Sequence, residues 1–253
     1  MMDHISVSQI NLYLDCSLKY KFYYIDRIPK PFKPSGILFG KAIHSALEWL
    51  NKQRQIGNHV NLEKLFKIFE TDWFAYKAEE KVLFKEGETE EKLILKGKEL
   101  LSLYFHQQNE PVLMAELPFQ IPLISQTGEV LEVPLYGVID LIEKGDVITE
   151  FKTSQKTMDL FQVSNSLQLT AYSYAYEFLF QKRPKGLKIV NLVKSKNPKL
   201  EVIYTTREKK DYQRLFLLAK KVLEAIKARI FFPKPSFKCK ECEYQEYCQK
   251  WEG

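Results

Sequence analysis

The sequence predicts a mixed α/β or α+β domain in which helices flank a mixed β-sheet. Helical and strand-like periodicities follow one another in the order helices, strands, helix, strands, helix, which is the order expected of such a domain. The chain has 253 residues, of which 45% are hydrophobic, so it can bury a full core. We therefore expect one domain over residues 1–253, or one domain with a sizeable insertion.

The N-terminal part of the chain reads as helical. Residues 6–24 open with a serine that can cap a helix, and their apolar residues recur at helical spacing. Three prolines then predict an extended connector, which is followed by a helix over 36–50. Two amphipathic helices are predicted at 62–77 and 90–108. We interpret residues 45–110 as a helical insertion.

Strands dominate the middle of the chain, and helices return after it. Runs rich in β-branched and aromatic residues predict strands at 112–124, 130–142, 147–151, 187–193 and 200–205. A long helix is predicted at 160–180, and a basic helix at 207–231. These elements supply the sheet and the helices that cover it.

Charge and hydropathy narrow the class of partner. No apolar run approaches the length needed to span a bilayer, and MMDHISVSQ is not a signal peptide, so we expect a cytoplasmic protein without a membrane partner. Residues 181–253 contain 19 Lys and Arg but only 8 Asp and Glu. This basic region suits a polyanion such as a nucleic acid. Solvated lysines on helix faces are the alternative explanation.

Residues 137–152, GVIDLIEKGDVITEFK, read as a β-hairpin with acidic and basic residues near its strand ends. A two-residue loop would place Asp140 and Glu150 on opposite faces. A three-residue loop that ends at Gly145 pairs Asp140 with Ile148 instead. Asp140, Glu150 and Lys152 then share one face of the hairpin.

Two carboxylates on neighbouring strands can reach one hard divalent cation. This is the reason to consider Asp140 and Glu150 as metal ligands rather than as ordinary charged residues. The alternative is that such residues are solvated or form weak surface ion pairs. Glu116, at the end of the first strand run, is a further candidate that could assist a second ion.

Three helical residues are also candidates. His44 lies on the helix predicted at 36–50, where a histidine is more often a packed or surface residue than a ligand. Gln168 and Tyr172 are four residues apart on the long helix and so share a face. Taken alone, this pair is equally compatible with a polar neighbour of a core tyrosine.

The cysteines are more informative than any of these. The chain contains 4 cysteines, Cys16, Cys239, Cys242 and Cys248. The last three have the spacing C-x2-C-x5-C. Disulfides are not expected in the cytoplasm, so four thiols with a close triplet predict one metal centre, iron-sulfur or zinc. Four-cysteine zinc sites more often come as two close pairs.

In this order, these residues resemble the motifs of the PD-(D/E)XK nuclease superfamily, in its RecB-like branch. The resemblance rests on His44 in FGKAIH, Asp140 in GVIDLIE, Glu150 and Lys152 in ITEFKTS, and Gln168 and Tyr172 in QLTAYSYAY, together with the opening SVSQINLYLDCSLKYKFYY. One upstream cysteine and a downstream triplet resemble the iron-sulfur subgroup, which includes the AddB nuclease domain and the CRISPR-associated exonucleases of spacer acquisition. The resemblance extends over essentially the whole chain.

The resemblance implies a restriction-endonuclease-like core and a hydrolytic site. His44, Asp140, Glu150 and the carbonyl of Phe151 would hold Mn²⁺ or Mg²⁺, and the nitrogen ligand favours manganese. Lys152 would position or deprotonate the attacking water, and Gln168 and Tyr172 would orient Lys152 or the phosphate. The four cysteines would bind a 4Fe-4S cluster, with residues 232–253 forming a cluster-binding tail joined to Cys16.

The function so implied is that of a metal-dependent DNA exonuclease that hydrolyses phosphodiester bonds. Single-stranded DNA or DNA ends would be its substrate, in recombination, DNA repair or the antiviral defence that CRISPR spacer acquisition provides. A helicase or a CRISPR integrase would be its protein partner. The alternative is a module that binds single-stranded DNA within a larger complex without cutting it. Intact Asp140, Glu150 and Lys152 favour the enzyme, because a buried carboxylate pair is costly in a mere scaffold.

Overall fold

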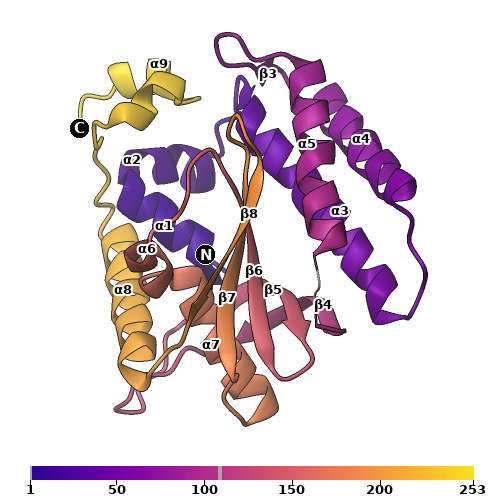
Figure 1. Cartoon of the computed structure of the whole chain (residues 1–253). Helices are drawn as coiled ribbons and strands as arrows, with labels where there is room; N and C mark the ends of the chain where they lie inside the picture. The colour runs from indigo at the N-terminus through magenta and orange to yellow at the C-terminus, as the bar shows by residue number, and fades with distance from the viewer. Residues whose placement is uncertain (1, 108–109) are drawn as a thin grey trace. The chain divides into compact units, whose positions relative to one another are not determined.

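The computed structural model describes residues 2–107 and 110–253, and the chain divides into two compact units. The terminal unit contains both chain ends and comprises Met1–Phe32, Phe119–Gly137 and Arg207–Gly253. The central unit comprises Lys33–Pro118 and Val138–Thr206. Figure 1 traces the chain through the elements of both units.

The central unit contains most of a mixed sheet. Strand β5 (Leu135–Glu143), which enters this unit at Val138, pairs antiparallel with β6 (Val147–Ser154). Strand β6 pairs parallel with β7 (Gly186–Val193), and β7 pairs antiparallel with β8 (Lys199–Thr205). Strand β4 (Val112–Ile121) also pairs with β5. The predicted mixed sheet flanked by helices is therefore confirmed.

Three long helices of the central unit pack against one another (Figure 1): α3 (Ser35–Gln55), α4 (Leu62–Glu79) and α5 (Glu90–His106). Their apolar faces enclose Phe39, Phe69 and Trp73, all of which are fully buried. The short strands β2 (Lys33–Pro34) and β3 (Val82–Leu83) pair at one end of these helices. Residue 108, the last residue of the helix predicted at 90–108, lies outside the described part of the chain.

The long helix predicted at 160–180 is two helices, α6 (Leu160–Ser164) and α7 (Leu167–Phe180). The break occurs because the Ser166 side chain accepts a hydrogen bond from the Leu169 backbone and so caps a new helix. Helix α7 packs on β6 and β7. It begins close in sequence to the end of β6, which carries Lys152.

The terminal unit joins the first residues of the chain to the last. Strand β1 (Ile5–Ser6) pairs parallel with the start of β5, and α1 (Val7–Asp15) contacts α8 (Lys209–Lys227). The remaining elements are α2 (Ser17–Tyr20), the π-helical turn η1 (Lys21–Ile25), the 3₁₀ turn η2 (Phe237–Glu241) and α9 (Gln245–Gln249).

The single helix predicted at 6–24 is wrong in one respect. Cys16 has an extended backbone, with φ −164° and ψ 106°, and it separates α1 from α2. The strand predicted at 130–142 also begins later than expected, at Leu135, after Pro134. Proline has no backbone N–H to donate to a strand ladder, which explains the later start.

Candidate active site

The two candidate carboxylates lie on the hairpin of β5 and β6. Leu141 pairs with Thr149, and the same register places Asp140 opposite Glu150, one residue further from the turn. The predicted pairing of Asp140 with Ile148 is therefore wrong. The turn has the predicted length of three residues but lies one residue later in the chain, at 144–146, and the φ of Asp146 is 63°. Directly opposed residues share a face, so Asp140 and Glu150 still project from the same side of the sheet.

Asp140 is held by a hydrogen bond at each carboxylate oxygen. The Phe151 backbone N–H donates to its Oδ2 at 2.8 Å, and the Tyr172 hydroxyl donates to its Oδ1 at 2.8 Å. Burial nevertheless raises the pKa of the Asp140 carboxyl, against the lowering effect of these two bonds. A nearby positive charge would therefore favour its ionised form.

Glu150 is buried, and its two carboxylate oxygens differ. Oε1 forms an ion pair with the Lys152 ammonium, whereas Oε2 is buried without a partner among the described residues. Burial, and then the charge of Asp140, raise the pKa of Glu150 to about 7. For Lys152, burial lowers the pKa, but the attraction of Glu150 outweighs it and the net shift is upward. The amine therefore stays protonated in this arrangement.

His44 approaches this pair from helix α3. Its Nδ1 lies 4.0 Å from Asp140 Oδ2, and its ring meets the Phe151 ring edge-on at 6.4 Å. Burial lowers the pKa of His44, and Glu150 offsets only part of that effect. A neutral imidazole offers a lone pair to a cation, which an imidazolium does not.

Helix α7 supplies the next two predicted residues. Tyr172 is buried and contacts Asp140, while burial together with Glu150 and Asp140 raises its pKa well above the ordinary value. The side chain of Gln168 bonds to Tyr172 and lowers that pKa in part. The two residues thus form a chain of contacts that leads to Asp140 rather than to Lys152.

Glu116 lies close to the same carboxylates. Its backbone has a φ of 53°, an unfavourable value for a residue other than glycine. Burial, and then Asp140 and Glu48, raise the pKa of Glu116 to about 8. The predicted residues of the hydrolytic site, namely His44, Glu116, Asp140, Glu150, Lys152, Gln168 and Tyr172, all belong to the central unit, and the structure brings them together.

The four cysteines gather separately, in the terminal unit. They are free thiols that line one small cavity with Phe22, Tyr244 and neighbouring residues. Burial raises the pKa of Cys248, and the three other cysteines add to that rise because they lie near it. The Ser236 backbone N–H donates to Cys239 Sγ at 3.3 Å.

Comparison with known proteins decides the family. The model of the PD-(D/E)XK nuclease superfamily matches residues 4–249. The chain belongs to the PD-(D/E)XK nuclease superfamily. A search of the curated proteins gave no match.

Two solved structures resemble this nuclease. One is "Putative exonuclease" of Eubacterium rectale, with a TM-score of 0.63 and 13% identity, over 99% of this chain and 89% of that one. The other is SSO0001, with a TM-score of 0.38 and 16% identity, over 95% of this chain and 92% of that one. At such identities the first shows a shared fold, and the second carries no weight.

Nucleases of this superfamily generally use divalent metal ions, and the donors of the site suit one. The part-buried carboxylate of Asp140, the buried carboxylate of Glu150 and the half-buried neutral imidazole of His44 form an oxygen-rich set with one nitrogen. Within residues 2–107 and 110–253, however, no three His, Cys, Asp or Glu side chains are arranged so that they could hold an ion. The site therefore suits a divalent cation by the chemical type of its donors and by the buried Glu150 Oε2, which has no partner among the described residues.

The structure adds two neighbours of the nuclease site that the sequence analysis missed, Glu48 and Lys52. Both influence the pKa of Glu116, and they form an ion pair with each other at 2.6 Å. They follow His44 at intervals of four residues and so continue its face of α3. This four-residue spacing is the sequence feature from which Glu48 and Lys52 could have been predicted as neighbours of the site.

The nuclease contains no helix, among its described residues, that is long and apolar enough to cross a membrane.

Proposed function

We propose that the protein is a metal-dependent DNA exonuclease that hydrolyses phosphodiester bonds. The observation that carries this proposal concerns the two oxygens of Glu150, which lies near Asp140: one is paired with Lys152, and the other is buried without a partner in the part of the chain that the structure describes. A buried acceptor is costly unless something occupies it. A cation at that oxygen would remove the cost and lower the pKa of both acids.

The residues then have distinct roles. His44, Asp140, Glu150 and the Phe151 carbonyl would bind Mn²⁺ or Mg²⁺, which when bound supplies Lewis-acid stabilisation of phosphate charge. The Phe151 N–H and the Tyr172 hydroxyl hold Asp140 in place, and Gln168 steadies Tyr172.

Lys152 is the protonated residue of the proposed site. Its ammonium is drawn to Glu150, and its side chain is 42% exposed. It can therefore hold the attacking water by a hydrogen bond and stabilise the charge that builds on the phosphate. Glu116 could assist a second ion, because its raised pKa would fall beside a cation.

We also propose that the protein belongs to the RecB-like branch with an iron-sulfur cluster, the branch of AddB and the CRISPR spacer-acquisition exonucleases. Four free thiols around one cavity are a suitable ligand set for a 4Fe-4S cluster. Zinc is the alternative occupant of the same set. The cluster-binding tail would be residues 232–253, and the helical insertion residues 45–110.

The substrate we propose is single-stranded DNA or DNA ends, with a helicase or a CRISPR integrase as partner. The basic composition of residues 181–253, with 19 Lys and Arg against 8 Asp and Glu, supports a polyanionic substrate. The pathway would be DNA repair or antiviral defence in the cytoplasm.

Incubation of end-labelled DNA with Mn²⁺ or Mg²⁺ tests the enzyme. We expect Glu150→Gln and Lys152→Ala to lower the cleavage rate by roughly a hundredfold or more, since each removes several kcal/mol of transition-state stabilisation. Lys67→Ala, which breaks an exposed ion pair with Glu63 on α4, is the matched control and should cleave at the wild-type rate. Wild-type cleavage by Glu150→Gln would refute the site, and binding without cleavage by the wild type would favour the non-cutting module.

The mode of cutting needs a second comparison. An exonuclease requires an end, so linear single strands should be degraded while covalently closed circles of the same sequence survive. Equal loss of circular and linear strands would identify an endonuclease and refute the exonuclease assignment, although the hydrolytic site would stand.

A further inference from the structure

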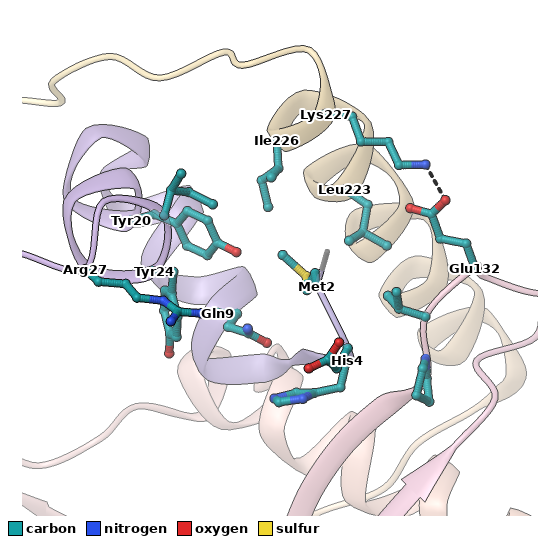
Figure 2. A pocket seen from close by; sticks show the side chains of 14 residues that line it. Met2, His4, Gln9, Tyr20, Tyr24, Arg27, Glu132, Leu223, Ile226 and Lys227 are labelled. Atoms are coloured by element: carbon teal, nitrogen blue, oxygen red, sulfur yellow. Dashed lines mark hydrogen bonds and ion pairs between the residues drawn. The ribbon is translucent and has the colours of Figure 1, made fainter.

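The terminal unit contains a cavity of about 950 Å³ in which no residue of the candidate active site takes part. Figure 2 shows its lining side chains, among them Asp3, His4, Gln9, Tyr20, Tyr24 and Arg27. A volume of this size lies at the upper end of the range typical of small-molecule sites, roughly 300 to 1,000 Å³.

The Tyr20 hydroxyl is the first reason to regard this cavity as a binding site. The residue is fully buried, and its hydroxyl has no hydrogen-bond partner among the described residues. In Figure 2 the hydroxyl points into the cavity, toward Met2. Tyr13, which packs edge-on against Tyr20 at 5.6 Å, differs in that its hydroxyl donates to the Ile230 carbonyl at 2.6 Å. Tyr20 therefore offers an unused donor and acceptor to whatever enters.

The backbone beside Tyr20 is unusual as well. Residues Lys21–Ile25 form a π-helical turn, a rare geometry that is frequent at functional sites. Arg27, just beyond it, has a φ of 53°. These two features bring Tyr24, Ile25 and Arg27 to the cavity wall. Strain of this kind persists only where the surrounding structure holds it.

The polar groups of the wall define the chemistry of a ligand. Lys227 and Glu132 neutralise each other in an ion pair, so the charges left to a ligand are those of Arg27 and Asp3. Gln9 uses its carbonyl oxygen to accept from the Ser6 backbone N–H at 2.6 Å, which leaves its amide N–H groups available. The wall thus presents donors, acceptors and one guanidinium beside aromatic rings.

We propose that this cavity binds one nucleoside phosphate. The base lies against the ring of Tyr24 with its polar edge at the Tyr20 hydroxyl, and the phosphate meets the Arg27 guanidinium. Bases stack on aromatic side chains and carry donors and acceptors on one edge, and arginine forms paired hydrogen bonds to phosphate. A purely apolar ligand would leave the charges of Arg27 and Asp3 unused.

The nucleoside phosphate has two sources, a nucleotide of a DNA strand or a free nucleotide. The assignment of the nucleoside phosphate to a DNA strand rests on the proposed nuclease function. The binding of a nucleoside phosphate in this cavity does not depend on that function. Binding is therefore measured with EDTA present, so that no cleavage occurs. Two probes are used. Binding of dAMP is measured by calorimetry, and binding of a fluorescein-labelled oligomer of deoxyadenosine is measured by fluorescence anisotropy.

Four variants separate binding from folding. Tyr20→Phe should lower the affinity about tenfold, the ratio expected when one hydrogen bond to the ligand is lost, and should leave the melting temperature unchanged or higher. Tyr13→Phe, which deprives the Ile230 carbonyl of its partner, should lower the melting temperature and leave the affinity unchanged. Arg27→Asn, with a residue that tolerates positive φ, should also weaken binding, whereas Arg229→Asn, at a φ of 55° outside the cavity, should not.

The outcomes are distinct. Tyr20-dependent binding of dAMP identifies a site for free nucleotides, and Tyr20-dependent binding of the oligomer alone identifies a strand-binding site. Absence of binding, or equal affinities for Tyr20→Phe and Tyr13→Phe, overturns the proposal. If DNA is not cleaved in the presence of metal but Tyr20-dependent binding persists, the proposed nuclease function fails while this site stands.

Discussion

At the residue scale, Asp140 and Glu150 show how two acids on one face of the sheet differ in their hydrogen bonding. Both oxygens of Asp140 accept hydrogen bonds from Phe151 and Tyr172, so its orientation is fixed. Oε1 of Glu150 forms an ion pair with Lys152, whereas Oε2 has no hydrogen-bond partner among the described residues. We infer that Asp140 is the more rigid ligand, and that Glu150 is the group whose ionisation responds most to an arriving cation.

The histidines provide a prediction at this scale. His44→Ala should weaken Mn²⁺ binding by roughly tenfold to a hundredfold, the range typical of groups that support a metal site, because His44 lies 4.0 Å from Asp140. His106→Ala, an exposed residue at the end of α5, is the control and should bind as the wild type does. Calorimetric titration measures both. Equal affinities would make His44 a structural residue.

The raised pKa of Glu116 provides a second prediction, for protein freed of metal by a chelator. A carboxyl with a folded pKa of about 8 and an ordinary pKa in the unfolded chain binds its proton more tightly when folded. The free energy of unfolding should therefore fall as the pH rises from the unfolded pKa to about 8. Glu116→Gln should reduce that fall.

Urea unfolding at several pH values between about 5 and 9 spans this window. Glu150, with a pKa of about 7, contributes in the same direction, so a residual slope is expected in the Glu116→Gln variant. Identical pH profiles for wild type and variant would contradict the raised pKa.

At the element scale, the close contact of α4 and α5 depends on one glycine. A Cβ added to Gly97 of α5 would lie 2.2 Å from the ring of Phe69, which is fully buried in α4. In such a close-packed core the ring cannot rotate away without displacing its neighbours. The helices can therefore approach this closely only because residue 97 has no side chain.

Gly97→Ala should accordingly lower the free energy of unfolding by about 1 to 3 kcal/mol through overpacking, despite the better helix propensity of alanine. Gly40→Ala in α3 is the matched control, since a Cβ there meets nothing within 4 Å. It should be neutral or stabilise by up to about 1 kcal/mol. Chemical unfolding of both variants measures the difference, and a stabilising Gly97→Ala would contradict the packing described here.

A buried ion pair between two strands also contributes at the element scale. The Lys188 ammonium of β7 lies 2.6 Å from the Glu143 carboxylate of β5, and both side chains are buried. The Thr149 hydroxyl donates to the same carboxylate at 2.7 Å. Loss of one partner would leave an uncompensated charge, so this pair specifies which strands meet beside the hairpin.

At the scale of the whole molecule, contacts within the terminal unit tie the two chain ends together. Glu243 is buried between Lys19 at 2.7 Å and Lys30 at 3.2 Å. Burial raises the pKa of Glu243, but the hydrogen bond from Lys19 and both positive charges lower it overall. The Tyr244 hydroxyl donates to the Ile28 carbonyl at 2.9 Å. These bonds hold the C-terminal tail against residues 19–30.

A metal centre at the four cysteines would close almost the whole chain into one loop, which chain-entropy reasoning values at about 5 kcal/mol. Cys242→Ser should therefore lose bound metal and melt at a lower temperature, while the protein that stays folded still cleaves DNA, because the proposed catalytic residues belong to the central unit. Elemental analysis of anaerobically purified protein should find iron and sulfide. Zinc without iron would refute the cluster, and an unchanged melting temperature would refute its stabilising role.

The sequence by itself determined the mixed sheet and the helix order, and it indicated most residues of the candidate site. Binary patterning and propensity are local, so α3, α4 and α5 follow from apolar spacing, and the sheet follows from runs such as 187–193. The chemical types at His44, Asp140 and Glu150, in that order, indicated a family that the match to residues 4–249 then showed.

Only the tertiary structure decided the register of the hairpin, the break at Cys16, the neighbours Glu48 and Lys52, and the cavity at Tyr20. The register depends on the position of a turn to within one residue, and the other features depend on groups distant in sequence. Local patterns do not carry this information. The turn at Asp146 shifts the partner of Asp140, and the orphaned hydroxyl of Tyr20 is visible only once its surroundings are packed. Register and hydrogen-bond satisfaction are properties of pairs of segments, which is why the sequence could name the acids but not their partners.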